Sequence, residues 1–181
     1  MLFSGIPFLY TFLPIVLALY ALSPKKLKNS VLLLSSLVFY GCGGPKYLLL
    51  MVGAILIGYI GGLLIGRAET RRVKKIFLTL SILLLAGLLG YFKYADFFVS
   101  NVNALFGASI PLLHVTLPIG ISFYTFQILS YDVDVYRGTP VQKNLVDFAA
   151  YVSMFPQLIA GPIVRYTDVE KELKVRTHSA A

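Results

Sequence analysis

Residues 47–66 read YLLLMVGAILIGYIGGLLIG and carry no charged side chain over twenty positions. A helix of about 20 apolar residues is long enough to cross the hydrocarbon core of a bilayer. Similar charge-free runs cover residues 6–22, 29–45, 76–92, 97–131 and 148–164. The pattern predicts an all-α integral membrane protein, built as a multi-pass helical bundle.

The composition excludes several other classes of protein. Of the 181 residues, 57% are hydrophobic and 13% charged, and the mean hydropathy is +0.79. Soluble domains carry about 25% charged residues. Cys42 is the single cysteine, so the chain has no intrachain disulfide and no thiol pair for redox or zinc chemistry. A soluble enzyme, a disulfide-rich scaffold and a disordered tail are therefore poor matches.

The net charge of +8 comes from 16 basic residues that lie in short gaps between the apolar runs. They form no stripe interleaved with exposed aromatics, so nucleic-acid binding is not indicated. Membrane proteins concentrate such residues in cytoplasmic loops. Lys25, Lys26 and Lys28 follow the first run, and no basic residue precedes it. We therefore expect an N-terminus outside and a first helix that is an anchor rather than a secretory signal.

The same rule predicts the remaining topology. Residues 67–75 hold five basic residues and one acidic residue, and are expected in the cytoplasm. Residues 93–111 are then external, with Arg137 and Lys143 internal. Ten basic residues thus lie in inner loops, two in outer loops and four after the last apolar run. The expected elements are about five spans, near 6–22, 29–44, 47–66, 76–92 and 112–131, and a cytoplasmic tail, 166–181.

Small residues form a stripe along the third predicted span. Ala54, Gly58, Gly62 and Gly66 are spaced by four and share one helix face. Such a face lets another helix approach closely. Helix packing is the favoured interpretation, and a ligand groove is the alternative. Ala86 and Gly90 repeat the spacing once.

Residues 145–165 differ from the other runs. Asn144 is placed to cap a helix, which Pro156 interrupts, and a Gly161-Pro162 pair interrupts the chain again. Broken backbone at membrane depth is tolerated where protein or a water-filled cavity satisfies its polar groups. We expect a broken or re-entrant segment that lines a cavity, with a kinked plain span as the alternative.

Polar residues that can serve a site lie in two stretches. Tyr124, Gln127 and Tyr131 follow i, i+3, i+7 spacing and share a face that must meet another helix or water. Interhelical hydrogen bonding is the simpler interpretation for each of them. Nearby, Arg137 can form an ion pair at the membrane surface with either Asp132 or Asp134. Beside the broken segment lie Gln157 and Arg165. The arginine can bind an anionic group such as a phosphate, or extend to the membrane surface.

The two histidines suggest no chemistry. His114 and His178 have no serine, cysteine or paired carboxylate at motif spacing, so neither a catalytic triad nor a metal site is predicted. No phosphate-binding glycine loop is present either. The residues alone therefore predict a multi-pass membrane protein with a cavity near its inner face, and no reaction.

Two long motifs carry a family resemblance. LPIGISFYTFQILSYDVDVYRG (117–138) and NLVDFAAYVSMFPQLIAGPIVRYTDV (144–169) closely resemble the membrane-bound O-acyltransferase family. The resemblance is to its alginate O-acetyltransferase-like branch, which includes related D-alanyl and peptidoglycan acyl-transfer proteins. Residues 36–50 and 91–98 also resemble the N-terminal half of that branch.

The resemblance implies a helical bundle in the bacterial inner (cytoplasmic) membrane, enclosing a tunnel. An acyl group, acetyl in the alginate branch, passes from a cytoplasmic donor to hydroxyls of an extracytoplasmic polysaccharide such as alginate. The donor is acetyl-CoA or an acyl-carrier thioester, with no bound cofactor. Periplasmic acetyl-transfer proteins are expected partners, and a histidine acts as general base.

Neither histidine of this chain matches the family's catalytic histidine, which lies well beyond Arg165. We therefore expect an N-terminal portion of the family domain, with no catalytic residue or metal site of its own and no activity without the C-terminal half. The alternative is a non-catalytic remnant, transporter-like or scaffolding. The residues expected to line the tunnel or its inner mouth are Tyr124, Gln127, Tyr131, Asp134, Arg137, Gln157 and Arg165.

Overall fold

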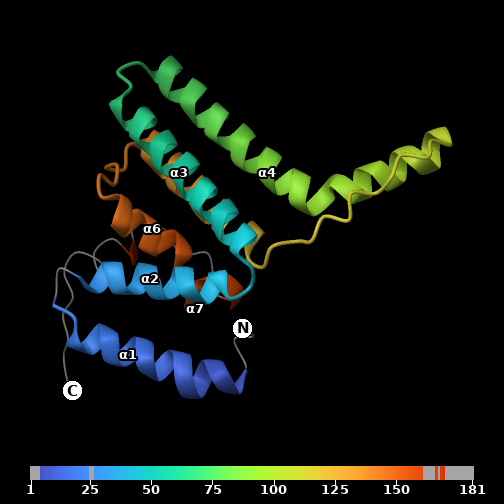
Figure 1. Ribbon diagram of the computed structural model, residues 1–181. Helices are drawn as coiled ribbons and strands as arrows, with labels where there is room; N and C mark the ends of the chain where they lie inside the picture. The colour runs from blue at the N-terminus through green and yellow to red at the C-terminus, as the bar shows by residue number, and fades with distance from the viewer. Residues whose placement is uncertain (1–4, 25–26, 161–165, 167, 170–181) are drawn as a thin grey trace.

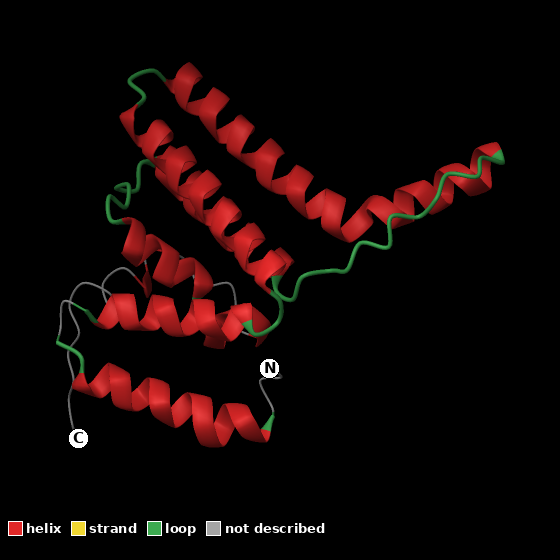
Figure 2. Cartoon of the chain, viewed as in Figure 1, coloured by secondary structure: helices red, strands yellow, loops and turns green. Residues whose placement is uncertain are grey.

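A computed structural model describes residues 5–24, 27–160, 166 and 168–169 of the chain. This part is helical and contains no strand, which confirms the predicted all-α class (Figures 1 and 2). The elements are the π-helix η1 (Phe8–Phe12), α1 (Leu13–Leu22), α2 (Lys28–Gly41), α3 (Pro45–Arg67), α4 (Arg71–Phe106), α5 (Ile121–Arg137), α6 (Leu145–Ser153) and α7 (Phe155–Ala160).

Two of the described helices, α3 and α4, are long and apolar enough to cross a membrane. With 23 residues, α3 is about 34 Å long, slightly more than the bilayer's hydrocarbon core of about 30 Å. The 14 residues of α2 reach only about 21 Å. The expected number of spans and the external N-terminus stay predictions.

The small-residue stripe of α3 is a packing seam for α5. A Cβ on Gly58 would overlap the Cγ2 methyl of Ile128, and one on Gly62 would lie 2.6 Å from Cε1 of Tyr131. Farther along, Gly66 faces Val141, just beyond the end of α5. The predicted close helix approach is confirmed. The second pair, Ala86 and Gly90, does not act in this way, because Gly90 has no neighbour within 4 Å of an added Cβ.

Helices α3, α4 and α5 pack together as one group, and α1, α2, α6 and α7 form a second group (Figure 1). Helix α2 packs against α6 and α1. Four phenylalanines hold the group together, with ring centroids 5.4–6.0 Å apart, namely Phe8, Phe12, Phe39 and Phe155. These rings bring the N-terminal helices against the start of α7.

The region between α4 and α5 differs from the expectation. We expected an external loop at 93–111 and a span at 112–131, but α4 continues to Phe106 and α5 begins only at Ile121. Between them, residues 107–118 lack regular structure. Gly107 ends α4 at a φ of +64°, and Pro111 and Pro118 lack the backbone donors that a helix requires. The apolar composition of 112–120 was therefore misleading about its conformation.

Helix α4 bends in its second half, and its far end projects from the bundle as an arm with the extended segment running back beside it (Figure 1). Two side chains fasten that segment to the helix. The Asp96 carboxylate accepts from the backbone N–H groups of Leu113 (2.7 Å) and Val115 (3.1 Å). The Asn103 amide bonds both the N–H and the carbonyl of Ile110. The arm is thus a hydrogen-bonded element.

The segment that follows α5 is broken. Asn144 Oδ1 accepts from Val146 N at 2.9 Å, which confirms the predicted cap. Helix α6 then ends at Ser153, and Met154 separates it from α7, which has Pro156 at its second position. Because Pro156 has no N–H to donate to the carbonyl of Val152, α6 does not continue through it, whereas proline is tolerated in the first turn of a new helix. The second predicted break, at 161–162, lies outside the described residues.

Candidate functional site

The predicted polar residues of α5 are buried within the bundle. Tyr124 and Tyr131 are fully inaccessible, and Gln127 is 6% exposed. Gln127 Nε2 donates to the backbone oxygen of Tyr151 at 3.1 Å, which ties α5 to α6. Tyr124 packs edge-on against Tyr40 of α2, with ring centroids 6.4 Å apart. Interhelical contacts therefore account for the burial of the Gln127 amide and of the Tyr124 ring.

Tyr131 lies in an aromatic cluster in the second half of α5. Its ring centroid is 4.7 Å from that of Phe148 and 5.3 Å from that of Tyr166, which in turn lies 5.3 Å from Tyr151. Gln142 joins the cluster, since its backbone N–H donates to Tyr131 Oη at 3.0 Å and its Nε2 to Tyr166 Oη at 2.6 Å. The cluster holds the α5–α6 connection in place.

Several buried oxygens near these helices have no hydrogen-bond partner in the described part of the chain. They are the Tyr124 hydroxyl, Thr125 Oγ1, Asp134 Oδ2 and Gln157 Oε1. A buried polar atom without a partner costs about 1–3 kcal/mol, so such atoms are rare unless water or a ligand reaches them. Helix α5 also contacts α7, which carries Gln157. We call Tyr124, Thr125, Gln127, Tyr131 and Asp134 the α5 polar face, and Gln157 lies beside it on α7.

Asp132 is a buried group that the sequence analysis considered only as an ion-pair partner of Arg137. It is fully inaccessible, and Ser81 Oγ of α4 donates to its Oδ2, while Oδ1 has no partner in the described part. An added Cβ on Gly61 of α3 would lie 3.0 Å from Ser81 Oγ and 3.3 Å from Asp132 Oδ2. Three helices therefore meet at this carboxylate. No spacing in the sequence connects Ser81 to Asp132, so only the tertiary packing identifies the pair.

The ion pair that the sequence allowed at this end of α5 does not form between the described residues. Arg137 is exposed at the last position of α5, and within the described residues it pairs with neither aspartate. Asp132 instead faces Ser81, because five residues of helix turn it to a different side from Arg137. Arg165, the remaining predicted residue, lies outside the described residues.

The described residues of the site provide a polar lining. His114 is exposed in the extended segment, at a φ of +49°. Among the residues that the structure describes, no three side chains of the histidine, cysteine, aspartate or glutamate type are grouped to hold a metal ion. What the arrangement supplies is a row of hydroxyl, amide and carboxylate groups within an apolar bundle.

Similarity to known proteins covers nearly the whole chain. It is 46% identical over 185 aligned residues to the probable alginate O-acetylase AlgI of Pseudomonas aeruginosa, with 99% of this chain and 36% of that protein covered. The corresponding protein of Azotobacter vinelandii is also 46% identical, with 99% and 37% covered. The peptidoglycan O-acetyltransferase of Helicobacter pylori is 32% identical, with 96% and 39% covered. No family model and no solved structure matches the chain.

The chain thus spans little more than a third of the length of the curated relatives that it matches. At 40–46% identity to five alginate O-acetylases, it corresponds to the N-terminal part of a membrane-bound O-acyltransferase-type protein.

Proposed function

We propose that this chain, as the N-terminal part of a membrane-bound O-acyltransferase-type protein, belongs to a membrane enzyme that acetylates polysaccharide hydroxyls. The observation that carries the proposal is the 46% identity to alginate O-acetylases over 99% of the chain. The acceptor that this favours is alginate, because the peptidoglycan O-acetyltransferase relative is less similar, at 32%. The membrane is the bacterial inner membrane.

Within that enzyme, the α5 polar face lines the acyl-transfer tunnel. Unpartnered buried oxygens on α5 and α7 support this assignment, because a hydrated substrate path supplies the partners that lipid cannot. Tyr124, Gln127 and Gln157 line the tunnel, and Tyr131, Asp134 and Arg137 stand near its inner mouth. Arg165 contributes a cation there for the phosphate groups of the donor.

The acyl donor in this proposal is acetyl-CoA or an acyl-carrier thioester, presented from the cytoplasm beside Arg137 and Lys143, which are both exposed. Neither His114 nor His178 is assigned as a base. The base is expected in the part of the enzyme that this chain does not cover, and periplasmic acetyl-transfer proteins act on the product side.

A chimaera tests the proposal directly. Residues 1–181 replace the matching segment of the Pseudomonas aeruginosa relative in a strain that lacks its own copy, and the acetyl content of secreted alginate is measured. We expect acetylation to be restored, and the 181-residue chain alone to give none. If this chimaera and the one described next are both inserted in the membrane and both fail to acetylate, the acetyltransferase assignment is contradicted, and a non-catalytic transporter-like or scaffolding role is supported.

The acceptor is tested by the same exchange in the Helicobacter pylori relative, with peptidoglycan acetylation as the measurement. If only that chimaera is active, the alginate assignment is wrong while the acetyltransferase assignment stands. A chimaera that carries Gln127→Leu and keeps full activity would remove this residue from the tunnel.

A further inference from the structure

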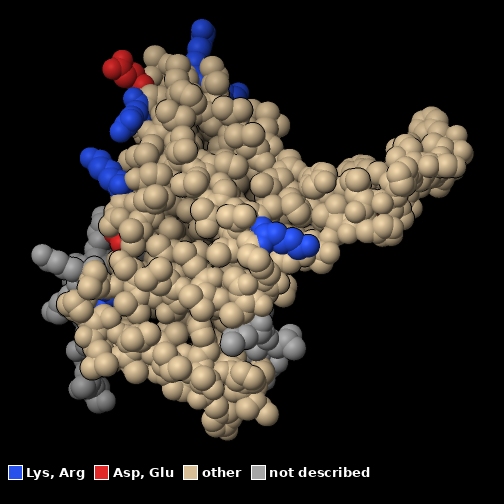
Figure 3. Space-filling view, in the orientation of Figure 1, with Lys and Arg blue, Asp and Glu red and all other residues tan. Residues whose placement is uncertain are grey.

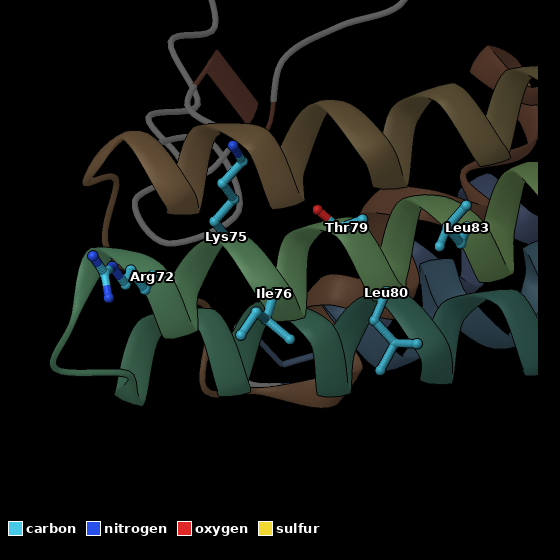
Figure 4. Close-up of a pocket in the computed structure, with 6 residues that line it drawn as sticks. All are labelled: Arg72, Lys75, Ile76, Thr79, Leu80 and Leu83. Carbon is cyan, nitrogen blue, oxygen red and sulfur yellow. The ribbon is translucent and has the colours of Figure 1, made fainter.

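An open groove runs along the outer face of α4, near the turn that joins α3 to α4 (Figure 4). Its volume is about 580 Å³, and the described residues that line it all come from α4. The lining residues are Arg72, Lys75, Ile76, Thr79, Leu80 and Leu83.

The groove has a charged end and an apolar end. Its lining forms two rows with helical i, i+4 spacing, one from Arg72 through Ile76 to Leu80 and the other from Lys75 through Thr79 to Leu83. Each row therefore begins with a cation and continues with mostly apolar surface, as Figure 4 shows. Ile76 is 63% exposed and Leu83 64% exposed. From Ile76 to Leu83 the helix rises about 10 Å, a length that one segment of an acyl chain can follow.

The charge around the groove has one predominant sign. Residues 67–75 hold five basic residues, and Glu69 is the only acid among them. Figure 3 shows this end of the molecule with basic side chains gathered above an almost uncharged surface. The groove itself contains no acidic residue, and its cations lie in the first turns of α4, where the helix dipole also favours an anion.

We propose that this groove binds an anionic phospholipid, with the headgroup phosphate at Arg72 and Lys75 and an acyl chain along Ile76, Leu80 and Leu83. Basic sites at the cytoplasmic ends of membrane helices bind such headgroups. This binding is independent of the acetyltransferase assignment. A lipid is the occupant because only 11% of the apolar window of α4 is buried, and the cations stand at one end of an apolar row, as a phospholipid requires.

Single-tryptophan fluorescence provides the test, since the chain contains no tryptophan. Leu83→Trp places the probe in the groove, and Leu56→Trp, at a position 41% exposed on α3 and ten residues from the nearest basic side chain of that helix, is the control. Each full-length variant is placed in vesicles that contain either brominated phosphatidylglycerol or brominated phosphatidylcholine in an unbrominated phosphatidylcholine background. Bromine quenches tryptophan fluorescence on contact. The dependence of the fluorescence on the fraction of brominated lipid therefore gives the relative occupancy of the groove by each lipid.

We expect the Leu83→Trp probe to be quenched by the anionic lipid at a roughly 25-fold lower fraction than by the zwitterionic one, since each of the two cations favours an anionic headgroup by about fivefold. In the double variant Arg72→Gln with Lys75→Gln this preference is expected to fall close to unity, whereas the Leu56→Trp probe is expected to show no preference in either background. Equal quenching by both lipids, or a preference that survives the double substitution, would overturn the proposal. Absence of quenching by either lipid would show that protein covers the groove, and would also overturn it.

Discussion

The α3–α5 seam and the outer face of α4 are built from similar residues and have opposite surroundings. Both α3 and α4 are charge-free over long stretches and both are rich in leucine, although α3 has five glycines in 23 residues and α4 has two in 36. On α3, an added Cβ at Gly58 or Gly62 would strike α5, whereas Gly87 and Gly90 of α4 have open space around them. Apolar composition therefore makes both helices candidate membrane segments. The placement of the small residues distinguishes the packed face of α3 from the open face of α4.

The difference has a physical origin. Lipid is as apolar as leucine, so helices in a bilayer gain little from hiding leucines and associate through close van der Waals packing and hydrogen bonds. Glycines at a spacing of four supply the close approach on α3, and Ser81 with Asp132 supplies a buried hydrogen bond. The outer face of α4 has neither feature among the described residues, in agreement with the lipid contact proposed above.

The largest effect is expected at the seam. Gly58→Ala should lower the free energy of unfolding by about 3 kcal/mol, because the branched Ile128 side chain has little freedom to move aside. Gly87→Ala is the matched control on α4, where removing a helical glycine should stabilise the protein by up to about 1 kcal/mol. Denaturant titration of both variants in the same detergent measures the contrast, and equal effects would remove the distinction between the two faces.

A smaller loss is expected where α4 joins the core. Ser81→Ala removes the donor to Asp132 and leaves the buried carboxylate with no partner in the described part. The free energy of unfolding, measured by the same titration, should fall by about 2 kcal/mol.

The double variant Ser81→Ala with Asp132→Leu distinguishes this cause from a simple loss of volume. Replacing both partners by apolar groups is close to neutral, so the double variant should be more stable than Ser81→Ala alone. If the stability losses of Ser81→Ala and Asp132→Leu measured singly add up in the double variant, the pairing of Ser81 with Asp132 is contradicted.

A local effect is expected in the arm. Asp96→Ala releases the N–H groups of Leu113 and Val115, and their hydrogen exchange should accelerate by about fivefold, the equivalent of about 1 kcal/mol. Global stability should change little. The amide of Ile110, which Asn103 holds, serves as the internal reference, and acceleration there to the same extent would show that the whole arm unfolds.

The smallest effect is expected on the outer face of α4. Leu83→Ala should change the unfolding free energy by no more than about 0.5 kcal/mol, because the side chain is largely exposed. Leu85→Ala, two positions away at a fully buried site, should cost about 2 kcal/mol or more. A substantial loss at Leu83 would show that this face packs against protein.

Much of the fold could be predicted from local signals. The glycine stripe of α3, the Asn144 cap and the break near Pro156 each depend on residues close in sequence. The extended segment 107–118 could not be predicted from hydropathy, because an apolar composition does not distinguish a helix from an irregular segment held by Asp96. For the site, i, i+3, i+7 spacing placed Tyr124, Gln127 and Tyr131 on one face, but their partners lie mostly on α2 and α6. The Ser81–Asp132 contact joins residues 51 positions apart.

Helix α5 begins after Gly120, at a φ of +78°, and ends before Gly138, at +114°. Both glycines use left-handed backbone, which other residues adopt with strain, so the two ends of the helix are fixed points. One residue inserted between Gly120 and Ile128 would rotate the rest of α5 by about 100° about the helix axis. Tyr131 would then no longer pack against Gly62 of α3. The exposed side of α5 tolerates substitution, whereas the seventeen-residue length of the helix tolerates neither insertion nor deletion.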